Sequence, residues 1–237
     1  MKKVILASTI LAMVGSANAE SLFESYIPLI GIDYKWTRAT IVNDWNHFFA
    51  ESFPGVSIYG AMKFMENLGV ELGYDMTARK GKNTAVRAGD SLGGLTLGNA
   101  VGNPSGYHTS LRFAGIHADL IGFLPIDANL ELFFTLGVAK VKPTVFVQSL
   151  NLSPTDLSNA FNEAMISLRG QHHKVSRIGI GANWAISDSV GFRAKVLWEG
   201  MHTLMLKDNV SAGVNQVTVL KPWLKGYSIA FGFFMKY

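Results

Sequence analysis

Apolar side chains recur at every second position in eight stretches of this chain. Between 130 and 138, for example, Leu132, Phe134 and Leu136 alternate with Glu131 and Thr135. Successive side chains of a β-strand point to opposite faces, so each stretch predicts a strand with one apolar face and one polar or small face. The eight predicted strands lie at about 26–37, 56–64, 70–77, 107–123, 130–138, 177–186, 190–199 and 227–237.

The connections between these strands alternate between short and long. Three are short, at 66–69, 124–129 and 187–189, and four are long, at about 38–54, 79–106, 150–172 and 207–219. Barrels of bacterial outer membranes have short periplasmic turns and long outer loops. The predicted fold is therefore all-β: an eight-stranded antiparallel transmembrane up-and-down β-barrel. We expect its first strand to pair with its last, because closure leaves no unpaired strand edge in lipid.

The composition supports membrane strands. The chain is 49% hydrophobic, with a mean hydropathy of +0.22. After the N-terminal segment no stretch predicts a transmembrane helix, since the best one, 116–141, is interrupted by His117, Asp119, Asp127 and Glu131. Soluble β-sandwiches also alternate apolar and polar residues, but they have no reason to sort their connections by length.

The first 19 residues predict a signal peptide. Lys2 and Lys3 precede an apolar stretch at 4–14, which is too short to span a bilayer, and Ala17-Asn18-Ala19 fits the small-residue cleavage pattern. We expect export through the Sec pathway and a barrel over residues 20–237. An even number of strands then places both termini in the periplasm. Removing two lysines leaves 19 Lys and Arg against 17 Asp and Glu, so the charge gives no case for nucleic acid.

Two segments carry more specific expectations. In the fourth strand, Leu111 and Phe113 are in phase, but the apolar positions then change to Ile116, Ala118 and Leu120. One extra residue inverts the facing of a strand, so we expect a β-bulge near Ala114-Gly115. Within the third long connection, the spacing of apolar residues predicts a helix over 153–169 that closes over the barrel mouth, with a surface that meets a partner as the alternative interpretation.

Three motifs resemble a known group of proteins. The segment 227–237, YSIAFGFFMKY, resembles the C-terminal signal of outer-membrane barrels, although its last residue is Tyr237 instead of Phe. The segment 66–74, ENLGVELGY, and the hairpin 177–193 are similar to the small barrels of the OmpA, OmpX and Opa type. The resemblance implies the bacterial outer membrane, with Phe233 and Tyr237 as the assembly signal read by the barrel-assembly machinery. It implies an architecture and no particular activity.

Charged residues on the predicted inward faces form the first candidate site. They are Asp33, Lys35, Lys63, Glu71, Asp75, Glu131, Arg193, Lys195 and Glu199. An eight-stranded barrel is just wide enough for side chains to fill it, and isolated buried charges cost several kcal/mol each. We therefore expect these charges to pair across the lumen and plug it. A narrow gated pore is the functional alternative.

The remaining motifs predict no catalytic, cofactor or metal site. His108-Thr109-Ser110 is similar to the His-x-Ser of a barrel esterase that deacylates lipopolysaccharide, but no acid partner is identified. His172-His173 is interpreted as a surface pair, and no histidine spacing forms a metal site. The Gly93-Gly94 region lacks the Gly-Lys-Ser/Thr of a phosphate loop.

The predicted function is an envelope-structural or adhesin-like surface-interaction role through the four long loops. The alternative is a narrow channel for small or hydrophobic solutes, as in OmpW-like barrels. A lipid-modifying barrel enzyme would need a catalytic set that the sequence does not display. The expected partners are outer-membrane lipid, lipopolysaccharide and the assembly machinery, together with a host or surface ligand of unknown identity.

Overall fold

The computed structural model describes residues 27–42, 48–85, 91–92, 95–96, 106–150, 172–201 and 223–236. The expected signal peptide, the expected helix at 153–169 and Tyr237 lie outside these residues. Within the described part of the chain, no helix has the length and apolar composition needed to cross a membrane.

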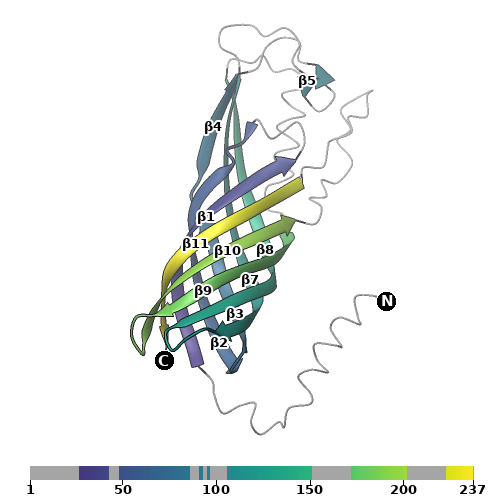
Figure 1. The fold of residues 1–237 in the computed structure, drawn as a ribbon. Helices are drawn as coiled ribbons and strands as arrows, with labels where there is room; N and C mark the ends of the chain where they lie inside the picture. The colour runs from purple at the N-terminus through teal and green to yellow at the C-terminus, as the bar shows by residue number, and fades with distance from the viewer. Residues whose placement is uncertain are drawn as a thin grey trace, which may run out of the picture.

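The described strands form a closed antiparallel barrel of eight staves, which confirms the predicted fold class (Figure 1). Seven staves are single strands, whereas β3 and β4 follow one another along β7 and together form the eighth. The first strand pairs with the last from Leu29–Lys236 to Val42–Trp223, so neither edge is left open. The strands are β1 (Ile27–Val42), β2 (Ser52–Met65), β3 (Leu68–Thr77), β4 (Lys80–Ala85), β7 (Gly106–Pro125), β8 (Leu130–Leu150), β9 (His173–Ala185), β10 (Val190–Met201) and β11 (Trp223–Lys236). A separate pair, β5 (Ser91–Leu92) and β6 (Leu95–Thr96), belongs to the connection between β4 and β7.

The connections differ between the two ends of the barrel. At one end, here called the turn end, only 66–67, 126–129 and 186–189 join the strands. Local polar groups close these turns: Asp127 accepts hydrogen bonds from the backbone N–H of Asn129 and Leu130, both at 2.7 Å. At the other end, the loop end, the connections are 43–51, 86–105, 151–172 and 202–222. The predicted alternation of short and long connections is confirmed.

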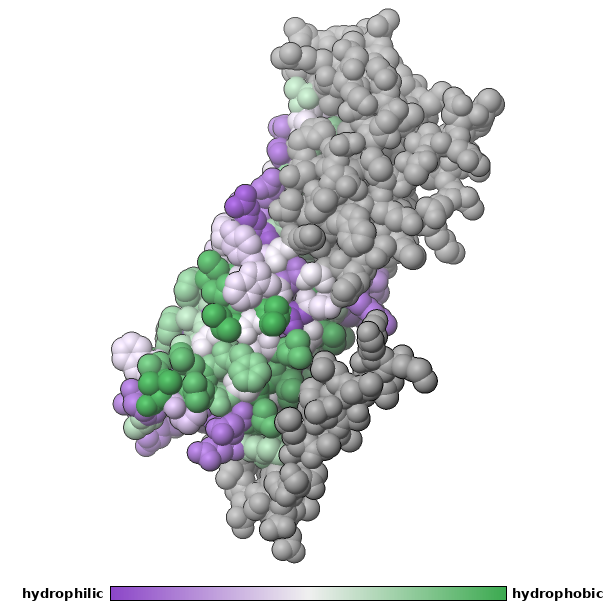
Figure 2. Space-filling view, turned by 45° about the vertical axis from the view of Figure 1, so that its right-hand side comes forward, coloured by the Kyte–Doolittle hydropathy of each residue, from purple (hydrophilic) through white to green (hydrophobic). Residues whose placement is uncertain are grey.

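The outward face of the barrel is an apolar belt. Side chains from all eight staves point outward with large exposed fractions, including Ile32, Leu72, Phe134, Ile180 and Phe233 at 52–64%. Figure 2 shows the belt on one face as a green band, with hydrophilic residues at the turn end and beyond its upper border. Soluble monomers rarely expose a continuous apolar surface of this extent, whereas lipid-facing strands require one.

The expected bulge near Ala114-Gly115 is wrong. The β7–β8 pairing runs without a shift from Gly106–Leu150 to Pro125–Glu131. Leu111 and Phe113 point into the barrel on the same face as His117, because the lumen itself becomes apolar near the loop end. The strand keeps the same register, but its apolar residues are on the inner face at Leu111 and Phe113 and on the outer face at Ile116.

The extra residues lie in other strands. The β2–β3 pairing shifts between Lys63 and Met65, which leaves Phe64 as the additional residue. A second shift separates the pair Met76–Ala114 of β3 and β7 from the pair Lys80–Leu111 of β4 and β7. There the three residues 77–79, between β3 and β4, lie opposite only two residues of β7, so the extra residue belongs to the β3–β4 stretch and not to β7.

Candidate functional site in the barrel lumen

The inward-facing side chains form three layers along the barrel axis. A layer at the turn end is apolar and aromatic: Leu29, Tyr59, Ala61, Ile121, Phe123, Phe133 and Phe234. The middle layer, here called the charged layer, contains Asp33, Lys35, Glu71, Asp75, His117, Asp119, Arg177, Arg193, Lys195 and Glu199. The loop-end apolar layer contains Ala39, Phe53, Leu111, Phe113, Val145 and Val175. Alternation along each strand places all three layers on the same inner face.

Glu71 is the centre of the charged layer. Arg193 Nη1 donates to its Oε2 at 2.5 Å, and Lys195 Nζ donates to its Oε1 at 3.1 Å. Glu71 belongs to β3 and the two cations belong to β10, on the opposite wall of the eight-stave barrel. Lys195 Nζ also lies 3.3 Å from Asp33 Oδ2 on β1. One carboxylate therefore joins opposite walls.

The turn-end aromatic layer supports Arg193 directly. Its guanidinium lies 4.5 Å from the ring centroids of both Tyr59 and Phe133. An aromatic face attracts a cation, and this attraction increases when both groups are shielded from water. The guanidinium is therefore held by rings on two staves as well as by the carboxylate of Glu71.

A second group of ion pairs lies nearer the loop end. Lys35 Nζ donates to Asp75 Oδ2 and to Glu199 Oε1, both at 2.8 Å. Arg177 lies 3.5–3.7 Å from Asp75, Asp119 and Glu199. Lys35 and Arg177 thus share two of their carboxylates, so that charges from β1, β3, β7, β9 and β10 form one connected network.

The pair Lys63–Glu131 lies at the edge of the turn-end layer. Lys63 contacts Glu131 Oε1, and its ammonium lies 4.3 Å from the ring of Phe123. Asn183 donates to the other oxygen of Glu131 at 3.3 Å. Both charged side chains keep about a fifth of their surface exposed, so this pair is less completely removed from water than the charged layer.

Three members of the charged layer, His117, Asp119 and Arg177, were missing from the sequence-based set. Arg177 alternates in step with Gly179 and Asn183, so its inward position could have been predicted from the sequence. His117 and Asp119 alternate with Ile116, Ala118 and Leu120, so their inward facing could also have been read from the sequence. A Cβ at Gly73 would meet the His117 ring at 2.5 Å, so glycine makes room for the imidazole against the wall.

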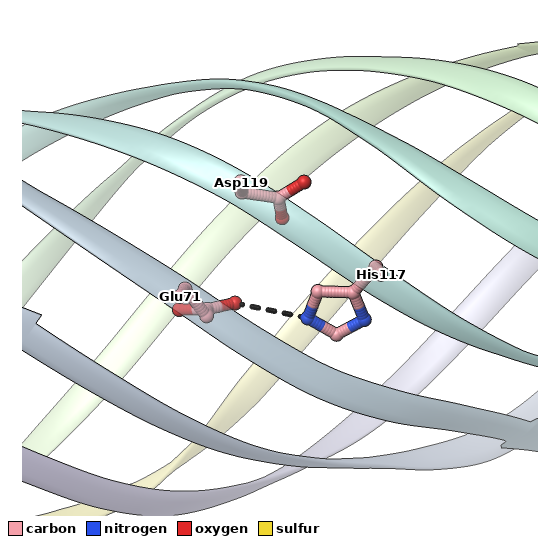
Figure 3. A group of neighbouring side chains, drawn as sticks. All are labelled: Glu71, His117 and Asp119. Atoms are coloured by element: carbon pink, nitrogen blue, oxygen red, sulfur yellow. Dashed lines mark hydrogen bonds and ion pairs between the residues drawn. The ribbon is translucent and has the colours of Figure 1, made fainter.

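Glu71, His117 and Asp119 form a compact buried group (Figure 3). One ligand atom from each lies within 4.8 Å of the others, a donor set that divalent metals accept. However, Glu71 already binds Arg193 and Lys195, and Asp119 lies 3.5 Å from Arg177. Three neighbouring cations oppose a further positive ion, so the geometry supports ion pairing in this group.

The network is close to electrical balance. Six inward carboxylates, Asp33, Glu71, Asp75, Asp119, Glu131 and Glu199, face five cations, Lys35, Lys63, Arg177, Arg193 and Lys195. The buried imidazole of His117 lies 3.3 Å from Glu71 and 3.5 Å from Asp75. Pairing of this kind is what offsets the cost of burying charge.

Above the charged layer lies a small cavity of about 50 Å³. Lys35, Asp75 and Glu199 line it on one side, and Thr37, Ala39, Phe113 and Val175 are among the residues on the other. One water needs about 10–15 Å³ on this measure, so the space accommodates a few waters. Beyond it, Phe53 packs edge-on against Phe113, with ring centroids 5.1 Å apart.

The other sequence candidates lie outside the lumen network. His108 and Ser110 share the outward face of β7 near the loop end, and His108 Nδ1 lies 2.5 Å from Asn83 Oδ1 instead of contacting a carboxylate. The expected surface pair is wrong for His173, which is buried, whereas its neighbour His172 is exposed. Phe233 is on the outer face, 57% exposed, with its ring 5.8 Å from that of Phe192.

No family model matches this sequence, and no curated protein matches it. Solved structures of small outer-membrane barrels are similar in fold. The attachment invasion locus protein Ail of Yersinia pestis, in complex with the heparin analogue sucrose octasulfate, is 12% identical, with a TM-score of 0.47 over 90% of this chain and 99% of Ail. Neisserial surface protein A is 10% identical, with a TM-score of 0.49 over 90% of this chain and 100% of that protein. OprG of Pseudomonas aeruginosa is 12% identical, with a TM-score of 0.43 over 90% and 95% of the two chains.

Proposed function

We propose that this chain is an integral barrel of a bacterial outer membrane with a closed lumen, and that it acts in envelope structure or surface interaction through its loop end. The observation that carries the proposal is the network joining opposite walls, above all Arg193 and Lys195 on Glu71. These side chains lie across the bore and are almost fully buried. A barrel filled in this way is a rigid support for whatever its loop end presents.

The membrane location rests on the apolar belt. On β8 the outward residues from Leu132 to Val138 are all apolar and exposed, while Phe133, Thr135 and Gly137 point inward. A membrane strand needs about 9–11 residues, which the segment 130–138 supplies. With the short turns in the periplasm, both ends of the chain would lie on that side, and the assembly machinery would read the last strand through Phe233 and Tyr237.

The alternative, a channel for small or hydrophobic solutes, draws on the loop-end apolar layer and its cavity. The space there is only about 50 Å³, and Lys35 with its two carboxylates separates it from the turn end. A transport path would need this network to open. The geometry therefore favours the closed barrel.

Conductance in planar bilayers tests the proposal. We expect the reconstituted full-length protein to give no stable current steps. The double variant Arg177→Ala/Phe113→Ala removes two large inward side chains from adjacent layers and should produce small steps if it folds. Outward Phe134→Ala is the matched control and should remain silent. Regular steps from the unmodified protein would overturn the closed lumen and support transport.

A further inference from the structure

The outer surface changes abruptly at the loop-end border of the apolar belt on β7, β8 and β9. On β8 the outward positions Leu136 and Val138 are followed by Lys140 and Lys142, and on β9 Ile178 is followed toward the loop end by Ser176 and Lys174. The three lysines are exposed. On β7, Arg112 is the outward partner of Thr144, one outward step beyond Lys142 toward the loop end. These four residues, Arg112, Lys140, Lys142 and Lys174, are here called the basic border.

The basic border brings like charges together. Lys140 and Lys174 are direct cross-strand partners, and Lys142 is the next outward residue on the same strand. Directly opposed residues have Cβ atoms about 4.5–5.5 Å apart, and like charges at that distance destabilise a sheet. The arrangement therefore calls for an anion between the ammonium groups.

The described part of the protein provides no such anion. Of the described carboxylates, six face the lumen, and Glu66, Asp127 and Asp188 lie in the turns at the opposite end. The remaining one, Glu51, pairs with Arg38 on β1. No ion pair among the described residues involves the basic border, so its counter-ion has to come from outside this part of the chain.

The position identifies the chemistry of that counter-ion. The border begins one outward step beyond the lipid-facing residue Val138, which is the depth of the headgroups in the leaflet around the loop end. On the adjoining strands β10, β11 and β1 the belt ends in the aromatic residues Trp198, Tyr227 and Trp36. Cations concentrated on one arc, at headgroup depth, are suited to phosphate groups carried by lipid.

We propose that the basic border is a binding site for a phosphorylated lipid headgroup, with one phosphate held between Lys140 and Lys174 and further anionic groups held by Lys142 and Arg112. The site rests on the proposed membrane location and deepens it, because it specifies which lipid chemistry the barrel retains. The neighbouring outward residues Val138 and Ile178 would contact the acyl chains of the same lipid.

The test uses the full-length protein inserted into phosphatidylcholine vesicles containing a small fraction of lipid A. Lipid retained on the extracted barrel is counted by native mass spectrometry. We expect retention of lipid A by the unmodified protein and binding roughly tenfold weaker, or more, in Lys140→Gln/Lys174→Gln, since each surface lysine contributes about 1 kcal/mol toward anionic lipid. Lys80→Gln/Lys82→Gln is the matched control, because these residues pair with Leu111 and Thr109 on the other face of the sheet.

A second measurement separates binding from folding. In neutral detergent without lipid A, Lys140→Gln/Lys174→Gln should unfold at the same or a higher temperature than the unmodified protein, because a repulsion is removed. In lipid A vesicles the order should reverse. A variant that is less stable in both media would mean that the lysines are structural and would overturn the site.

The remaining outcomes identify the source of the anion. Lipid A retention that survives excess inorganic phosphate supports a lipid headgroup, whereas binding of inorganic phosphate without lipid A overturns it. Lysine-dependent binding of a heparin oligosaccharide, with no lipid dependence, would assign the border to a sulfated glycan instead. Failure of the unmodified barrel to insert into vesicles would contradict the proposed membrane location. Normal insertion with equal lipid retention in both variants would contradict only the lipid site.

Discussion

The charged layer and the loop-end apolar layer share the strands β1, β7 and β9 but are filled by opposite chemistry. On β7, Asp119 and His117 join the ion-pair network, while Phe113 and Leu111, on the same inner face, pack with Phe53 and Val145. Apolar packing is non-directional and depends on the area removed from water. Buried charges are stabilised only in specific pairs. The comparison teaches that one layer links particular walls, whereas the other only fills space.

The largest effect should come from removing the centre of the charged layer. Glu71→Ala leaves Arg193 and Lys195 buried without their shared carboxylate, and we expect a loss of about 3–5 kcal/mol in the free energy of unfolding. Urea titration in lipid vesicles measures it. Glu66→Ala, in an exposed turn, is the control and should change little. A cost for Glu71→Ala no greater than that of the control would show that the layer is not held by pairing.

The next effect tests whether the other face of these strands lies in lipid. Ile180 is 58% exposed on the belt, so Ile180→Arg should cost about 2–4 kcal/mol near the middle of the membrane. Gln148→Arg, outward and beyond the belt on β8, should cost much less. The same vesicle titration compares them. Equal costs at the two depths would contradict the assignment of the belt.

A change in the loop-end apolar layer should be moderate and insensitive to salt. Leu111 is 3% exposed, and Leu111→Ala should cost about 2–3 kcal/mol through lost apolar contact and the cavity that remains. Unfolding titrations at low and high ionic strength check it, with Leu124→Ala on the outer face as the control. A strong salt dependence for Leu111→Ala would mean that the two layers are energetically coupled.

The smallest effect should come from the partly exposed pair at the turn end. Lys63→Ala removes the cation from Glu131, which keeps Asn183 as a donor, and we expect a cost of less than about 1 kcal/mol. Measuring Lys63→Ala and Glu71→Ala under identical conditions gives the ratio of their losses in the free energy of unfolding. A Lys63→Ala cost as large as that of Glu71→Ala would show that burial does not distinguish the two sites.

Much of the architecture followed from alternation alone. Outward side chains such as Phe134 and Ile180, inward Thr135, and the pairing of the first strand with the last all required only the period of two and the sorting of connections by length. These features are local or topological. They do not depend on which side chains meet across the lumen.

The errors came from non-local packing. Leu111 and Phe113 were assigned to the same apolar face as Ile116, Ala118 and Leu120, although they line the lumen near the loop end. The alternation of Ile116, Ala118 and Leu120 already implied that His117 and Asp119 face inward, so both could have been added to the candidate set. Which charges meet also depends on the tilt and stagger of facing staves. The sequence alone therefore left Glu71 as one of several candidates for Arg193 and Lys195.

The pairing of β1 with β11 also determines when this protein can become a membrane protein. The first strand, β1, finds one of its two neighbours only in β11, the last barrel strand to be synthesised. Without β11, the edges of β1 and β10 have unpaired backbone N–H and C=O groups, which are not tolerated in the hydrocarbon core of a membrane. Insertion must therefore wait until β11 has been synthesised, and until the barrel closes another factor has to shield the unpaired strands.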